Sequence, residues 1–148
     1  MISCNAGRNT QRYAAEKLVT DPTRQEVTMP FVKRKVPVDV DFKNHPAIQS
    51  LAKWGPKLRK QIEEACFANY QEKLASIGAE ALPKIRQPSH VWKHMKIQSV
   101  RIDTTVPDRI VVYVVPDWDE EEHLEWCIEG ADRLVYVGQF LGYPVDGY

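Results

Sequence analysis

The stretch of sequence that decides the fold lies in the last third of the chain and reads Ile110-Val111-Val112-Tyr113-Val114-Val115-Pro116-Asp117-Trp118-Asp119-Glu120-Glu121-Glu122-His123-Leu124-Glu125-Trp126-Cys127-Ile128. Its first part is an uncharged run of strand formers, which is typical of a strand buried on both faces. Its last part alternates, so Leu124, Trp126 and Ile128 are expected on one face, and His123, Glu125 and Cys127 on the other. The residues between, 116–123, form an acidic bend that joins the two strands.

Further strands are expected on either side of this pair. Their predicted bounds are 96–104 before it and 133–137 after it, with the pair itself at 109–115 and 123–128. The turn 129–132 contains Gly130 and is short enough to join antiparallel strands. The C-terminal part of the chain is therefore predicted to be an antiparallel meander.

An N-terminal hairpin is predicted over 26–42. Apolar residues alternate there on both sides of a turn placed at Lys33-Arg34-Lys35. Pro30 and Pro37 each lack a backbone donor, which places these strands at a sheet edge or beside a bulge. The segment 13–19 fits a short helix or an edge strand equally well, and residues 1–9 are expected to be frayed.

The period becomes helical between the two groups of strands. Pro46 suits the start of a short helix ending near Trp54, and Pro56 opens a longer one that Gly78 ends. The apolar stripe of the longer helix is expected to cover the sheet and consists of Leu58, Ile62, Ala65, Cys66, Tyr70, Leu74 and Ile77. Ser89 can cap a brief helical turn at 90–94. The predicted class is α+β, an antiparallel sheet made of the hairpin and the meander, with one long amphipathic helix and short helices packed on one face.

Length and charge bound the kind of protein. The 148 residues suit a single domain, 1–148, and 43% hydrophobic with 27% charged residues is typical of a soluble globular chain. Its 20 basic and 20 acidic residues are unevenly distributed: residues 1–100 hold 17 Lys and Arg against 9 Asp and Glu, and residues 101–148 hold 3 against 11. If the halves form separate surfaces, this polarity favours a charged partner.

The cysteines and the absence of long apolar runs indicate a cytoplasmic protein. The chain has an odd number of cysteines, Cys4, Cys66 and Cys127, and they lack CxxC spacing. Reduced thiols are therefore expected, and neither a disulfide framework nor a zinc knuckle is predicted. No run approaches the roughly 18 apolar residues that a membrane span needs, and no membrane partner is expected.

Few residues suit catalysis or cofactor binding. His90 and His94 are four apart, so on an α-helix they would share a face and could bind a metal with Asp117 or His123 as a third ligand, but the HExxH pattern is absent. Cys66 and Cys127 occupy apolar positions, unlike nucleophilic thiols. Phosphate-binding glycine loops and a serine elbow are also missing. We therefore expect no enzyme activity, no cofactor and no metal.

Two alternatives remain open for Trp118. It either plugs the core while its acidic neighbours face water, or it is an aromatic anchor ringed by acids, as in a binding hot spot. Nucleic-acid binding would have to use Lys33, Arg34 and Lys35 beside Phe31, which is a weak signal, and the acidic last third would repel phosphates. No nucleic-acid partner is expected.

The acidic bend and its surroundings resemble an uncharacterised bacterial domain family whose mark is a Trp-Asp-x-Glu-His-Gly-Leu turn followed by a strand ending in Val-Gly. The corresponding stretches here are Trp118-Asp119-Glu120-Glu121-Glu122-His123-Leu124 and Leu134-Val135-Tyr136-Val137-Gly138. Val91-Trp92-Lys93 and Ala68-Asn69-Tyr70 extend the likeness upstream. In an alignment without a gap, the family's His falls on Glu122 and its Gly on His123.

Such families often look like immunity proteins encoded beside secreted antibacterial toxins. The resemblance implies an inhibitor that occludes a cognate toxin without catalysis, and the acidic charge suggests a toxin with a basic surface. The expected partner-binding residues are Asp117, Trp118, Asp119, Glu120, Glu121, Glu122, His123 and Glu125. The alternatives are a metal-assisted hydrolase using His90, His94 and nearby carboxylates, and a subunit that forms a homodimer through exposed strands.

Overall fold

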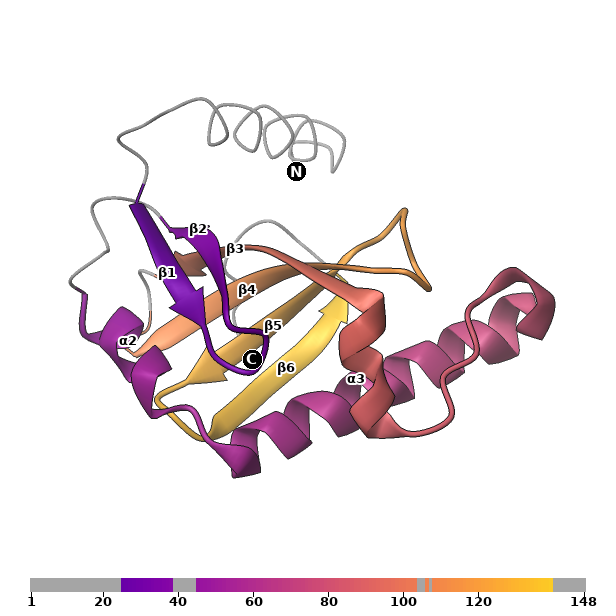
Figure 1. Cartoon of the computed structure of the whole chain (residues 1–148), viewed down its shortest axis with the longest axis horizontal. Helices are drawn as coiled ribbons and strands as arrows, with labels where there is room; N and C mark the ends of the chain where they lie inside the picture. Colours follow the sequence, from indigo (N-terminus) through magenta and orange to yellow (C-terminus); the bar gives the residue numbers. More distant parts are fainter. Residues whose placement is uncertain (1–24, 39–44, 104–105, 107, 140–148) are drawn as a thin grey trace.

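The computed structural model describes residues 25–38, 45–103, 106 and 108–139 (Figure 1). The expectations for 1–9, for 13–19, for Val40 and Phe42, and for the tail beyond Gln139 lie outside these residues. The elements follow one another as β1 (Gln25–Met29), β2 (Arg34–Val38), α2 (Pro46–Gln49), η2 (Ser50–Lys53), α3 (Pro56–Ile77), η3 (Ala79–Ala81), η4 (Pro88–His94), β3 (Met95–Ile102), β4 (Arg109–Pro116), β5 (Leu124–Glu129) and β6 (Arg133–Gln139).

The strands form one six-stranded sheet in the order of the sequence, β1-β2-β3-β4-β5-β6. The hairpin and the meander are antiparallel, which confirms the α+β class. One pairing differs from the expected antiparallel sheet, because β2 runs parallel to β3 and pairs with it only at Val38 and Val100. Parallel neighbours need a crossover connection, and the helical segment between β2 and β3 supplies it.

The hairpin turn lies earlier than predicted. Lys33 N donates to Met29 O over 3.0 Å, which closes a turn at 30–33 and leaves Arg34 and Lys35 in β2. Phe31 and Lys33 have φ values of 74° and 53°, in the left-handed region that residues other than glycine rarely adopt. No glycine marks this turn, so the sequence carried no signal for its position. The expectation for the prolines holds in part. Pro30 lies in the turn, and β1 is a sheet edge, but Pro37 lies in β2, which has β1 on one side and pairs with β3 at Val38 on the other.

The long helix confirms the predicted bounds and most of the predicted stripe. Leu58, Ile62, Cys66 and Tyr70 are buried at intervals of four residues. Ile77 corrects the prediction, because its side chain is 47% exposed at the end of α3, where the helix projects past the sheet (Figure 1). Among the described residues, no helix combines the length and the apolarity needed to cross a membrane.

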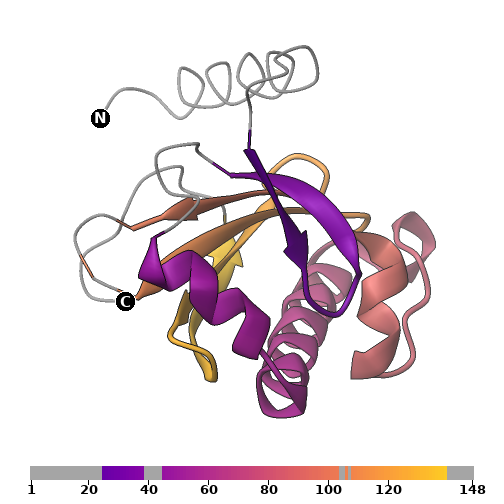
Figure 2. The ribbon, with the colours of Figure 1, turned by 60° about the vertical axis from the view of Figure 1, so that its left-hand side comes forward.

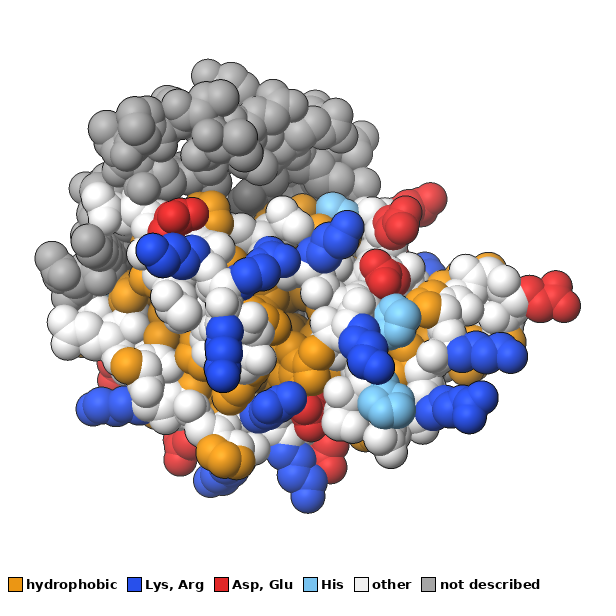
Figure 3. Space-filling model, in the orientation of Figure 1, with side chains coloured by type: hydrophobic (Ala, Val, Ile, Leu, Met, Phe, Trp, Pro, Cys, Tyr) orange, Lys and Arg blue, Asp and Glu red, His pale blue; other side chains and the backbone are white. Residues whose placement is uncertain are grey.

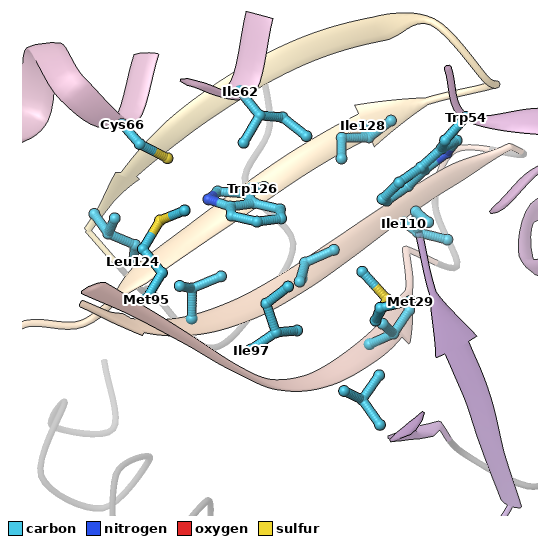
Figure 4. Packing of buried hydrophobic residues seen from close by; sticks show 14 of the residues in the cluster. Met29, Trp54, Ile62, Cys66, Met95, Ile97, Ile110, Leu124, Trp126 and Ile128 are labelled. Carbon is cyan, nitrogen blue, oxygen red and sulfur yellow. The ribbon is translucent and has the colours of Figure 1, made fainter. Parts of the chain in front are cut away.

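The core lies between the sheet and the helices. Figure 2 shows α2 and α3 on the same side of the sheet. Trp126 of β5 lies near the centre of the buried cluster, between Cys66 and Ile62 of α3 and the side chains of β3 and β4 (Figure 4). Its ring meets that of Trp92 edge-on at 5.8 Å. The contact between these two rings thus connects β5 to η4.

The strand β5 is buried on both faces, which corrects the half-covered strand predicted from its alternation. Glu125 and Cys127 are fully buried, although they lie on the face opposite Trp126. Tyr113 and Val111 of β4 are their cross-strand partners, and Arg101 of β3 brings Nη2 to 3.6 Å from Glu125 Oε1. An acidic residue in an alternating pattern predicts solvent exposure, and a neighbouring cation on the same face is what makes its burial tolerable.

Candidate functional site

The acidic bend, residues 116–123, is fixed by hydrogen bonds from its own backbone. Asp117 N donates to His94 O over 2.7 Å, which joins the bend to the end of η4. Within the bend, Asp119 N donates to Pro116 O at 3.3 Å, and the Asp119 carboxylate accepts from Glu122 N at 3.0 Å. The bend is therefore a defined turn whose carboxylates have set positions.

Trp118 is inside the protein. Its side chain is 1% exposed, its ring meets that of Tyr70 edge-on at 5.8 Å, and its Nε1 donates to Asn69 Oδ1 over 2.8 Å. Both partners belong to α3, so the indole holds the bend against the long helix. Of the two interpretations left open by the sequence, the core plug is correct, and Trp118 does not lie on the surface as an anchor for a partner.

His123 closes the other end of the bend. Its Nε2 lies 2.8 Å from the Glu120 carbonyl, and its Nδ1 lies 2.6 Å from the Tyr113 hydroxyl. A carbonyl only accepts, so Nε2 carries the hydrogen, and in the neutral ring Nδ1 then accepts from Tyr113. Both ring nitrogens of His123 are therefore engaged in holding the bend onto β4.

The carboxylates of the bend fall into two groups. Asp117 Oδ2 lies 3.0 Å from His94 Nδ1, and Asp119 Oδ2 lies 3.7 Å from Lys73 Nζ, so both face neighbouring elements. The side chains of Glu120, Glu121 and Glu122 are exposed. Together with the partly exposed Asp117, they give this end of the molecule an acidic surface. Figure 3 shows Asp and Glu side chains gathered at the upper right of the molecule.

Glu125 does not belong to this surface. It is fully buried on β5, beside Arg101, and is therefore not part of the exposed acidic surface. Of the eight residues predicted for the site, the structure therefore brings six together at the bend and leaves Trp118 and Glu125 in the interior. Those six are Asp117, Asp119, Glu120, Glu121, Glu122 and His123.

The two histidines considered for metal binding point in different directions. The segment that carries them, η4, is a 3₁₀ helix, so residues four apart lie about 120° apart around its axis. His90 Nε2 contacts Gln87 Nε2 at 2.9 Å, whereas His94 contacts Asp117. Within the described ranges, no group of three His, Cys, Asp or Glu side chains is arranged to hold a metal ion.

The buried cysteines are protected from ionisation. Burial raises the pKa of the Cys66 thiol to about 12, and the neighbouring Trp126 side chain opposes this shift by a smaller amount. Burial likewise raises the pKa of Cys127 to about 12, and the positive charge of Arg109 opposes this shift. Because the thiolate is the nucleophile, neither side chain is activated for covalent chemistry.

A family model described as "Domain of unknown function (DUF6985)" matches residues 12–144, which is most of the chain. The chain belongs to the DUF6985 family. This membership agrees with the expected likeness to an uncharacterised domain family. The comparisons with curated proteins and with solved structures each gave no match.

Sequence reasoning about this DUF6985 domain missed the residues that position the acidic bend. Lys73, Asn69 and Tyr113 lie outside the bend and hold Asp119, Trp118 and His123 respectively. Asn69 lies in the stretch 68–70 that extends the family resemblance, but no sequence pattern indicates its contact with Trp118. These pairings join residues far apart along the chain, and a single sequence contains no signal for them.

Proposed function

We propose that this DUF6985 member is a cytoplasmic immunity protein that occludes a cognate antibacterial toxin and performs no catalysis. One observation carries the proposal: Asp117, Glu120, Glu121 and Glu122 expose carboxylates on a bend whose backbone is fixed at both ends. The partner is a toxin with a basic surface. The contact surface is the bend without Trp118 and Glu125, which are interior residues.

A fixed acidic surface suits an inhibitor for two reasons. Clustered charges of one sign accelerate the encounter with an oppositely charged protein and discriminate against other partners. A turn that is already ordered loses little conformational freedom on binding, so more of the contact energy appears as affinity. The hydrogen bonds of Asp119 and His123 within the bend supply that order.

The alternative, a metal-assisted hydrolase, has less support. It requires His90 and His94 to converge with a carboxylate, and the 3₁₀ geometry of η4 separates them. His94 and Asp117 do lie within 3.0 Å of each other, but this pair already contributes to holding the bend. Elemental analysis of the purified protein tests the alternative, since a stoichiometric transition metal would favour it.

The test uses the product of the neighbouring gene as the candidate toxin. Co-expression should protect cells from that toxin, and the two proteins should co-purify as a complex that calorimetry can measure. Glu120→Lys with Glu121→Lys should weaken both protection and binding. The matched control is Glu64→Lys with Glu72→Lys, the same charge change at exposed positions of α3. If none of the toxins encoded next to this gene forms a complex with the protein, the result would count decisively against the proposal.

A further inference from the structure

A second surface of the molecule has the opposite charge. Figure 3 shows an apolar patch near the middle of one face, between the β1–β2 turn and η4, with Lys and Arg side chains around it. Phe31 of the turn and Trp92 of η4 are partly buried hydrophobic residues packed on the core. We call Phe31 and Trp92, with Lys33, Arg34, Arg59 and Lys93, the basic face.

The apolar centre of the basic face is held in position. The Phe31 ring stacks on Trp54 at 6.1 Å and lies 5.7 Å from Trp92, so the turn is packed against η2 and η4 together. Its φ of 74° is unfavourable for a bulky side chain. A loop that only connected two strands would not require an aromatic residue in this conformation. The ring therefore contributes to the packing that keeps the patch together.

Two of the cations at the rim are also fixed. The Arg59 guanidinium lies 5.9 Å from the Phe31 ring centre and 5.7 Å from that of Trp92. Glu63 Oε2 orients it, since this oxygen accepts from Arg59 Nε at 3.1 Å and from Trp92 Nε1 at 2.6 Å. Arg34 Nη2 donates to Ile97 O over 3.1 Å and so bridges β2 to β3.

The remaining cations are free to meet a partner. Lys33 lies in the same turn as Phe31, and Lys93 follows Trp92 in η4, and both side chains are exposed. Neither side chain makes a hydrogen bond or an ion pair with any residue of the described part of the chain. The basic face thus combines an ordered apolar centre with a charged rim, which is the anatomy of a protein-binding site.

We propose that the basic face binds an acidic protein segment, in which one large apolar side chain flanked by Asp and Glu contacts Phe31 and Trp92. The flanking carboxylates pair with Lys33, Arg34, Arg59 and Lys93. A single-stranded nucleic acid fits less well, because its bases need free ring faces for stacking. The Phe31 ring already contacts Trp54, Trp92 and Arg59.

This binding does not depend on the function proposed for the acidic bend. The two surfaces have opposite charges and share no residue, so either proposal can be wrong while the other is right. A variant of the basic face that leaves toxin binding intact, or the converse, separates the two proposals.

The test measures fluorescence anisotropy with four labelled probes and the full chain at low ionic strength. The first is a peptide of Asp and Glu around a central Leu-Trp pair, the second its Lys and Arg counterpart, and the third an acidic peptide without the apolar pair. The fourth is a thymidine oligonucleotide of matched length. The first peptide should bind saturably and more tightly than the other three, and its affinity should fall as salt is added.

Lys33→Glu with Lys93→Glu should weaken binding of the first peptide at least about tenfold. The matched control is Lys84→Glu with Arg86→Glu, an equal charge change in the loop that Tyr70 holds through Pro83 O and Ile85 N. Both variants should unfold at the same denaturant concentration as the parent. No saturable binding of the first peptide, equal losses in the two variants, or tighter binding of the oligonucleotide would each overturn the proposal.

Discussion

The Trp118 indole, at the centre of the most acidic stretch of the chain, donates a hydrogen bond of 2.8 Å to Asn69 Oδ1 on the long helix. The ring is buried while Asp117 and Glu120 on either side face water. A bend with several like charges would be expected to move freely, because its charges repel one another. The indole counteracts this tendency by holding the bend on α3, and so fixes the surface for which we propose partner binding.

Replacing Trp118 with Phe should destabilise the protein by about 2–4 kcal/mol, because it removes the bond to Asn69 and leaves a void in the core. Urea unfolding measures the change. Asn69→Ala should cost less, about 1 kcal/mol, since the ring then remains in place. A Trp118→Phe variant as stable as the parent would show that the indole does not hold the bend.

Removing the buried guanidinium of Arg109 should destabilise the fold strongly. Arg109 Nε donates to Glu129 Oε2 at 2.9 Å, and its Nη1 lies 3.3 Å from Oδ2 of the buried Asp103. Arg109→Met deprives Asp103 of this cation, and a cost of about 3–5 kcal/mol is expected in thermal or urea unfolding.

The control for Arg109 is Arg133, which contacts the same Glu129 carboxylate. Arg133 Nη1 lies 3.2 Å from Glu129 Oε1, but its side chain is 70% exposed. Arg133→Met should change the free energy of unfolding by less than about 0.5 kcal/mol, since exposed ion pairs contribute little. Similar losses in the two variants would contradict the assignment of the stability to the buried pair.

Gly138 should tolerate no side chain while Tyr136 keeps its position. A Cβ at Gly138 would overlap Tyr136 Oη and would lie 2.5 Å from Tyr136 Cζ, so the ring must move. We expect Gly138→Ala to cost about 1–3 kcal/mol in urea unfolding. The same substitution in a Tyr136→Ser background should cost clearly less, and equal costs in both backgrounds would exclude this contact as the cause.

Alkaline pH should destabilise the protein through its buried thiols. The pKa of Cys66 and that of Cys127 are each raised by burial from 9.0 to about 12, so the folded state keeps protons that the unfolded state releases. The protonated thiols therefore contribute their full stabilisation below about pH 9. As the pH rises from about 9 toward about 12, the free energy of unfolding falls by about 1.4 kcal/mol per pH unit for each thiol.

Urea unfolding at pH values between about 8 and 10 measures the effect, because the tyrosines with raised pKa, Tyr113 and Tyr136, titrate at higher pH. The Cys66→Ala and Cys127→Ala variants should each lose part of the slope between about pH 9 and 10. A slope that is unchanged when both thiols are removed would refute the assignment.

The regular elements of this fold could be predicted from the sequence because their signals are local. Pro56 and Gly78 delimit the long helix, and the uncharged run from Ile110 to Val115 identifies the central strand. The parallel pairing of β2 with β3 was missed, since strand direction depends on how the intervening helices pack. The position of the hairpin turn was also missed, because Phe31 and Lys33 adopt a backbone conformation more typical of glycine.

The candidate site was predictable in location and only partly in composition. A cluster of acids between two strands identifies an exposed bend, and Glu120, Glu121 and Glu122 are exposed. Glu125 was expected on that surface, and the core plug was one of two interpretations left open for Trp118; both side chains are buried, in contact with the distant residues Arg101 and Asn69. Such contacts arise from tertiary packing, which alternation and composition do not encode.

The central claim is that the exposed carboxylates of the acidic bend attract a basic protein partner. The most direct measurement is the association rate constant with the cognate toxin, by stopped flow at low and high ionic strength. Glu120→Lys with Glu121→Lys should slow association at least about tenfold at low salt and flatten its salt dependence, with the melting temperature unchanged. An association rate unaffected by this variant, or slowed equally by Glu64→Lys with Glu72→Lys, would contradict the claim.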